Sequence, residues 1–154
     1  MKFKALPALA ALALLAACES APQTSGAETG AGAGPRPGSQ EDLAANAGDR
    51  VFFDFDKSLI RADGRATLDR QAPWFAKNPE VRATIEGHTD ERGTREYNLA
   101  LGQRRANAAR DYLVARGVSS ARLSTISYGK DRPIALGSNE EAWAQNRTAI
   151  TTVQ

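Results

Sequence analysis

Residues 81–117 read VRATIEGHTDERGTREYNLALGQRRANAARDYLVARG and contain the pattern that decides the fold. Residues 81–86 alternate between apolar and polar side chains, which is typical of a half-buried strand. A glycine-containing loop over residues 87–94 follows. The sequence then predicts a long helix from about Arg95 to Arg116, with Gly117 just beyond its C-terminus.

Two elements are predicted before this unit. Residues 50–55, RVFFDF, indicate an aromatic strand with three apolar side chains on one face, Val51, Phe53 and Phe55. Asp63 is the expected N-cap of a helix from Gly64 to about Lys77, which Asn78 and Pro79 end. The inward side chains expected for that helix are Leu68, Trp74 and Phe75.

Two strands and a helical turn are predicted after it. Residues 122–128 indicate a third strand and residues 147–153 a fourth, with a helical turn near 140–143 between them. The order β-α-β-α-β-β favours an α+β sandwich, in which two main helices pack on one face of a mixed four-stranded sheet.

The N-terminus resembles a bacterial export signal. A short basic start precedes an uncharged stretch from Ala5 to Leu15, which is too short to span a bilayer as a helix. Leu15-Ala16-Ala17-Cys18 is similar to a lipobox, so residues 1–17 are expected to be removed and Cys18 to carry the lipid. An ordinary secretory signal with an incidental cysteine is the alternative. Glu19 rather than aspartate follows the cysteine, which favours the outer membrane.

A tether is predicted between this anchor and the folded domain. From Glu19 to about Asn46 the chain is rich in Ala, Gly, Pro, Ser, Thr and Gln. Such a composition buries too little apolar surface to offset the entropy of ordering. Residues 18–48 are therefore expected to be a flexible tether, of which the part from Glu19 to Asn46 would reach about 95 Å when extended, and residues 49–154 to be the domain.

Composition excludes several classes of protein. The absence of a run of 18 apolar residues argues against a multi-span membrane protein, and one cysteine with one histidine against a zinc site. Removal of residues 1–17 leaves 18 basic and 18 acidic side chains. A balanced charge gives no electrostatic reason to bind nucleic acid.

One arginine of the long helix points toward the expected core. At 100° per residue, Arg105 lies in the middle of the arc that contains Leu101, Asn98 and Leu113. A buried, unpaired guanidinium costs about 3–5 kcal/mol. Arg105 is therefore expected to need a carboxylate partner, from either the protein or a ligand.

Asp90 is the nearest candidate partner, because it lies in the loop just before the helix. Asp90 and Arg105 together offer one group for an ammonium and one for a carboxylate, which suits the head group of a zwitterionic amino acid. The alternative is a structural salt bridge between the two residues. The residues alone leave both interpretations open.

The motif GHTDERGT at 87–94, followed by Tyr97-Asn98, Leu101-Gly102 and Arg104-Arg105-Ala106, resembles the signature of OmpA-like peptidoglycan-binding domains. The resemblance extends over residues 51–153. It implies an OmpA-like fold, no enzymatic activity, no cofactor, and non-covalent binding of meso-diaminopimelate in the peptidoglycan stem peptide. For lipid-anchored members it also implies attachment of the outer membrane to the wall, and work with the Tol proteins, chiefly the propeller protein TolB, in envelope integrity and cell division.

The resemblance also implies a role for each residue of the site. Asp90 would bind the ammonium group and Arg105 the carboxylate of the D-centre. The remaining residues would shape the pocket, form its opposite wall or reach the peptide: Thr89, Asn98, Leu101, Phe55, Asp56, Arg92 and Thr94.

Three alternatives compete with this function. Glu86, Asp90 and Glu91 are carboxylates that a glycoside hydrolase would need, but Glu86 is expected on the strand face opposite Ile85. The only histidine, His88, is expected to pack or form a hydrogen bond. A periplasmic interaction scaffold without a wall ligand is the second alternative. The third is a flagellar stator, which would need a membrane-spanning helix.

Overall fold

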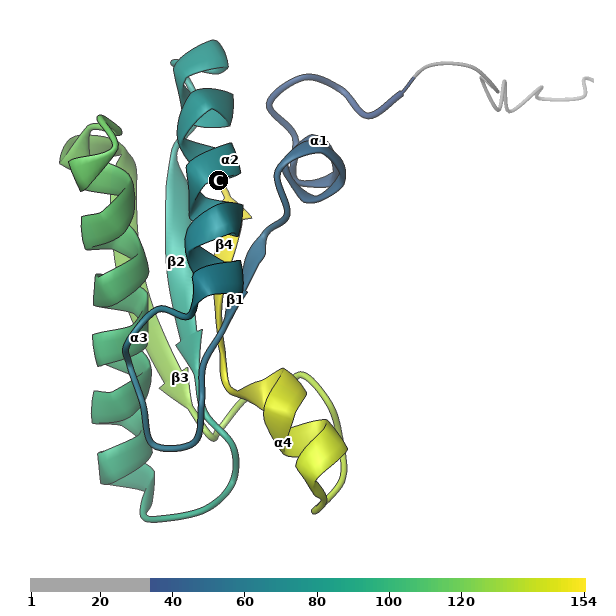
Figure 1. Cartoon of the computed structure of the whole chain (residues 1–154), viewed down its shortest axis with the longest axis vertical. Coiled ribbons are helices and arrows are strands. Elements are labelled where there is room, and N and C mark those ends of the chain that lie inside the picture. The colour runs from purple at the N-terminus through teal and green to yellow at the C-terminus, as the bar shows by residue number, and fades with distance from the viewer. Residues whose placement is uncertain (1–33) are drawn as a thin grey trace, which may run out of the picture. The chain divides into compact units, whose positions relative to one another are not determined.

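Four strands form one mixed sheet in the computed structural model, which describes residues 34–154 (Figure 1). They are β1 (Arg50–Phe52), β2 (Ala83–His88), β3 (Leu123–Gly129) and β4 (Thr148–Val153), and their order across the sheet is β1-β4-β2-β3. β4 is antiparallel to both of its neighbours, whereas β2 and β3 are parallel. The α+β fold with a mixed four-stranded sheet is confirmed.

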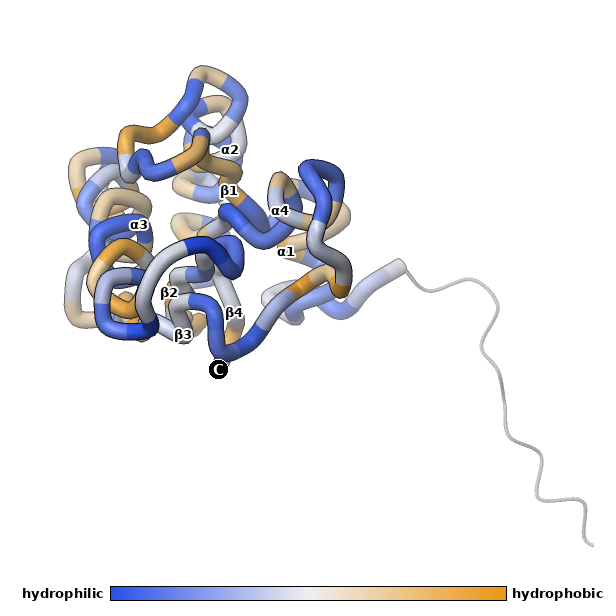
Figure 2. Tube along the Cα trace, turned by 90° about the horizontal axis from the view of Figure 1, so that it is seen from below, coloured by the Kyte–Doolittle hydropathy of each residue, from blue (hydrophilic) through white to orange (hydrophobic). Residues whose placement is uncertain are grey.

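Two long helices cover one face of this sheet (Figure 1). α2 (Ala62–Lys77) packs on β1, and α3 (Arg95–Ala115) packs on β2 and β3. Hydrophilic and hydrophobic segments follow one another along both helices, as expected when one side of a helix faces a core (Figure 2). None of the helices within residues 34–154 is both long and apolar enough to cross a membrane.

The core lies between these helices and the sheet. Its large apolar side chains come from both helices, the strands and the segments beside them, and include Leu43, Val51, Phe53, Leu68, Trp74, Phe75, Ile85 and Leu113. The three side chains expected to face inward from α2 are all buried. Burial of a side chain of this size contributes about 1.5–3 kcal/mol, so this layer holds α3 firmly on the strands.

The helix α3 approaches β2 very closely at two glycines. A Cβ atom on Gly87 would lie 1.8 Å from the carbonyl oxygen of Gly102, and one on Gly102 would lie 2.3 Å from Oγ of Ser127. Glycine inside a helix costs about 1 kcal/mol relative to alanine, which this close packing offsets. The contact fixes the N-terminal half of α3 against the end of β2, beside the candidate site.

The predicted tether is wrong at its C-terminal end. Residues Gln40–Asn46 form a helix, α1, whose N-cap is Ser39 and whose Leu43 is fully buried in the core. Nε1 of Trp74 donates to Asp42 at 2.9 Å, and the Gln40 side chain bonds to β4. The ordered domain therefore begins near Gly38 and not at Asp49. The expected signal peptide and Cys18 lie outside the described residues.

Two local expectations before β2 are also wrong. Strand β1 ends at Phe52, and Phe55 is 56% exposed rather than inward, because the chain turns at Asp56 with a φ of 56°. The N-cap of α2 is Arg61, so Asp63 lies in the first turn, where its carboxylate accepts from the amide of Gly64.

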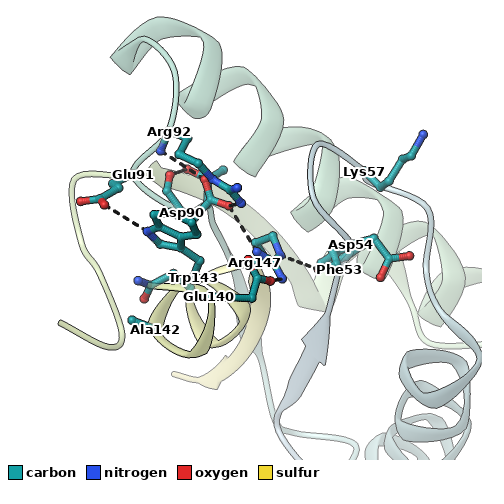
Figure 3. A network of polar contacts seen from close by, with 12 residues as sticks. Phe53, Asp54, Lys57, Asp90, Glu91, Arg92, Glu140, Ala142, Trp143 and Arg147 are labelled. Atoms are coloured by element: carbon teal, nitrogen blue, oxygen red, sulfur yellow. Dashed lines mark hydrogen bonds and ion pairs between the residues drawn. The ribbon is translucent and has the colours of Figure 1, made fainter. Parts of the chain in front are cut away.

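The two remaining elements are α4 (Glu140–Asn146), which is longer than the single helical turn expected, and a short 3-10 helix over Ser120–Arg122. α4 connects β3 to β4, and its N-cap is Asn139, whose side chain accepts from the amide of Ala142. Its position brings Trp143 and Glu140 toward the loop that follows β2 (Figure 3).

Candidate functional site

The candidate site lies where β2 ends and α3 begins. The loop between them, residues 89–94, ends at Thr94, whose hydroxyl caps the helix by accepting from the amide of Tyr97. The side-chain amide of Asn98 donates to the carbonyls of Arg92 and Thr94, both at 2.9 Å. These bonds hold the loop on the helix and leave Oδ1 of Asn98 as its free polar atom.

Arg105 is fully buried, as the helical period predicts, and its guanidinium is held by the backbone. Nε donates to the carbonyl of Lys57 at 2.8 Å, Nη1 to that of His88 at 2.8 Å, and Nη2 to that of Asp54 at 3.1 Å. Burial lowers the pKa of Arg105 to about 10, which still leaves it charged at neutral pH.

Three of the five N–H donors of a guanidinium are used in this way. One N–H on each terminal nitrogen of Arg105 remains. Backbone carbonyls thus accept three of the hydrogen bonds of the Arg105 guanidinium, in place of the carboxylate that the sequence led us to expect. A ligand carboxylate remains a suitable partner for the other two donors.

Asp90 is buried and paired with two other arginines. Its Oδ2 accepts from Nη2 of Arg92 at 2.6 Å and lies 3.4 Å from Nη1 of Arg147, and its Oδ1 accepts from the amide of Arg92 at 3.2 Å. Burial acts to raise the pKa of Asp90, but the bonds and charges of Arg92 and Arg147 outweigh it and hold the pKa below its ordinary value. The direct Asp90–Arg105 salt bridge that the sequence left open does not form among these described contacts.

Asp90 and Arg105 nevertheless line one cavity of about 190 Å³. Eight of the nine predicted pocket residues line it; Thr94 does not, because its side chain caps α3. Gly93 and Tyr97 complete the lining, and the Tyr97 hydroxyl donates to Asp56. The cavity combines an apolar wall with two carboxylates and two guanidinium groups, from Phe55, Leu101, Asp56, Asp90, Arg92 and Arg105.

A guanidinium held between two aromatic rings closes one side of the cavity. Cζ of Arg92 lies 4.0 Å from the ring centre of Phe55 and 4.1 Å from that of Trp143. Nε1 of Trp143 in turn donates to Glu91 at 3.0 Å (Figure 3). Contacts between a cation and an aromatic face contribute about 0.5–2 kcal/mol each. This arrangement joins α4, the β2–α3 loop and the segment after β1.

Sequence reasoning missed two residues that support Asp90, one on α4 and one between α4 and β4. Nη2 of Arg147 bonds to Glu140 at 2.6 Å and its Nε to the carbonyl of Phe53 at 3.2 Å, so the guanidinium beside Asp90 is itself fixed (Figure 3). No spacing in the sequence connects position 147 to position 90. Tyr97, by contrast, belongs to the quoted motif but is absent from the predicted site.

The other candidates for chemistry have structural contacts. His88 is buried, and its Nδ1 bonds to the carbonyl of Arg132 at 3.0 Å; burial lowers its pKa despite that bond and nearby Glu86. Of the three carboxylates considered for hydrolysis, Asp90 alone lines the described cavity, since Glu91 bonds to Trp143. Within residues 34–154 no three His, Cys, Asp or Glu side chains are grouped as a metal site requires.

Comparisons with known proteins agree with this arrangement. The model of the OmpA family matches residues 52–147. The chain is 62% identical to the peptidoglycan-associated lipoprotein of Rhizobium meliloti over 124 residues, covering 80% of this chain and 70% of that protein. It is 54% identical to the protein of the same name from Brucella melitensis, covering 93% of this chain and 85% of that protein.

Comparison with solved structures also finds a peptidoglycan-associated lipoprotein. The crystal structure of the peptidoglycan-associated lipoprotein from Burkholderia pseudomallei matches with a TM-score of 0.67 and 45% identity, covering 69% of this chain and 90% of that one. The chain therefore belongs to the OmpA family and, within it, to the peptidoglycan-associated lipoproteins.

Proposed function

We propose that this chain is an outer-membrane lipoprotein that binds peptidoglycan without a covalent bond, through meso-diaminopimelate of the stem peptide. The observation that carries the proposal is one cavity whose lining contains both Asp90 and Arg105, whose guanidinium bonds to the backbone through three of its five N–H groups. The D-centre of diaminopimelate carries an ammonium and a carboxylate, which match these two groups. The OmpA family is non-enzymatic, so binding is the whole activity of the site.

Three neighbours support an amino-acid head group in this cavity. Oδ1 of Asp90 has one backbone donor and could accept a further N–H from a ligand, and Oδ1 of Asn98 has no donor among the described residues and could accept another. Leu101 and the ring of Phe55 supply apolar surface for the methylene chain of the ligand. Guanidinium–carboxylate contacts are strong and directional, which favours Arg105 as the carboxylate contact.

We propose that Cys18, acylated after removal of residues 1–17, anchors the protein on the periplasmic side of the outer membrane. Several acyl chains give stable anchoring, at about 0.8 kcal/mol per buried methylene. The molecule would then attach the membrane to the wall as part of a Tol–Pal system in cell division.

Exposed Phe55 and Tyr97 at the cavity make the same surface suitable for a protein partner. We propose TolB as that partner, and we propose that it and the wall cannot be bound at the same time.

Co-sedimentation with purified sacculi tests the wall site. We expect Asp90→Ala and Arg105→Ala each to abolish sedimentation of the folded protein. Arg110→Ala is the matched control, because Arg110 lies on the same helix as Arg105 but pairs with Asp111 and does not line the cavity. Wild-type sedimentation of both folded site variants would show that the assigned pocket is wrong.

Membrane fractionation tests the anchor separately. We expect Cys18→Ser to move the protein from the outer-membrane fraction to the soluble periplasm, while sacculus binding of the purified protein is kept. Retention of the variant in the membrane fraction after a high-salt wash would contradict lipid anchoring at Cys18.

A further inference from the structure

Arg92 is fixed in front of the carboxylate that the ligand ammonium would reach. Its backbone amide and its Nη2 both donate to Asp90, and its guanidinium lies between the rings of Phe55 and Trp143. Movement of this side chain away from Asp90 would break a 2.6 Å ion pair and both ring contacts. Together with Arg147, which lies 3.4 Å from the same carboxylate, Arg92 thus places two cations on Asp90 before any ligand enters.

The charges that line the cavity are balanced. The two carboxylates are Asp56 and Asp90, and the two guanidinium groups are Arg92 and Arg105. The next charges behind them, Arg147 and Glu140, pair with each other at 2.6 Å. A ligand with one ammonium and one carboxylate keeps this balance, whereas a ligand with an ammonium alone adds an uncompensated positive charge beside Arg92.

We propose that Arg92 sets the charge selectivity of the site by excluding head groups that carry an ammonium without a carboxylate. The inference rests on the proposed binding of diaminopimelate and adds the reason why a lysine side chain, which lacks the second carboxylate, is rejected. Arg105 attracts the ligand carboxylate, and Arg92 repels an ammonium that arrives without one. Charges in a partly buried site interact strongly because the surrounding dielectric screens them poorly.

The test measures two ligands that differ only at this head group. The probes are the tripeptides L-Ala-γ-D-Glu-meso-diaminopimelate and L-Ala-γ-D-Glu-L-Lys, titrated calorimetrically into the full chain purified in a neutral detergent. The variants are Arg92→Gln, which removes the charge, and Arg92→Lys, which keeps it without the planar ring contacts. Arg95→Gln is the control, since Arg95 is an exposed residue three positions away that pairs with Asp131.

We expect Arg92→Gln to bind the lysine tripeptide on the order of tenfold more tightly than wild type does, so that preference for diaminopimelate falls by a similar factor. Arg92→Lys and Arg95→Gln should keep the wild-type preference. A folded Arg92→Gln variant that loses affinity for both tripeptides equally, or keeps the full preference, would overturn the inference. Loss of the preference in Arg92→Lys would overturn it as well.

The result for the wild-type protein distinguishes failure of this inference from failure of the proposed binding of diaminopimelate. Wild-type binding of the diaminopimelate tripeptide with no selectivity change in Arg92→Gln would overturn the role of Arg92 alone. Failure of the wild-type protein to bind the diaminopimelate tripeptide would overturn the proposed function, and the role of Arg92 with it.

Discussion

Asp90 and Arg105 line the same cavity with separate sets of partners: the carboxylate pairs with Arg92 and Arg147, and the guanidinium donates to three backbone carbonyls. Each charge is thus held in place without neutralising the other. A direct salt bridge would have used the donors and acceptors that a zwitterionic ligand requires. Because Asp90 and Arg105 do not pair with each other, the cavity is chemically suitable for a zwitterionic ligand.

Arg105→Lys should weaken both folding and sacculus binding although it keeps the charge. An ammonium cannot reach the carbonyls of Lys57, His88 and Asp54 with the planar geometry of a guanidinium. We expect the free energy of unfolding to fall by about 2–3 kcal/mol in urea titrations. Binding is then compared at a temperature where the variant is folded, and wild-type affinity there would contradict the carboxylate contact.

Asp90→Asn should lower the free energy of unfolding at neutral pH, and this difference from wild type should disappear in acid. The folded-state pKa of Asp90 lies below its ordinary value of 3.8, so its carboxylate contributes stability above about pH 4. This contribution is lost as the pH falls through the folded-state pKa. Urea unfolding of wild type and variant from neutral pH down to about pH 2.5 should show a gap that narrows below about pH 4; a gap that stays constant would contradict the assignment.

Gly87→Ala should be severely destabilising. The added methyl group would lie 1.8 Å from the backbone of α3, which cannot rotate away as a side chain could. We expect a loss of about 3 kcal/mol or more, measured by thermal unfolding. Gly34→Ala is the control, because a Cβ there meets nothing within 4 Å; equal effects at both positions would contradict the close packing of α3 on β2.

Leu43→Ala tests whether α1 belongs to the domain. Leu43 is fully buried in the core, and truncation of a buried leucine costs about 2–5 kcal/mol. Leu136→Ala serves as the control, since Leu136 is 88% exposed. A melting temperature unchanged by Leu43→Ala would indicate that the chain before residue 49 is a tether after all.

The site is predictable from sequence where its residues lie on one regular element or in one loop. The period of α3 places Arg105 inward, and the loop before it places Asp90 at the start of the helix. Arg147 and Trp143 cannot be found in this way, because Trp143 lies on α4 and Arg147 between α4 and β4, far along the chain from the loop. Only the tertiary fold brings them to Asp90 and Arg92.

The missed helix α1 has a different physical reason. Its seven residues contain one large apolar side chain, Leu43, inside a stretch whose composition is otherwise that of a linker. Averaged composition hides a single anchoring residue. A local signal is nevertheless present, since Ser39 accepts from the amide of Asp42 three residues later, a typical N-cap arrangement.

The docking of α1 shortens the distance over which one molecule can connect two layers of the envelope. With the proposed lipid on Cys18, the chain from that residue to the domain boundary at Gly38 would span at most about 70 Å. The same reach per residue would have allowed about 105 Å from Cys18 to the boundary at Asp49 that composition predicts. Because α1 is fixed against the core, the proposed anchor and the proposed wall site could act together only across a smaller gap between membrane and murein.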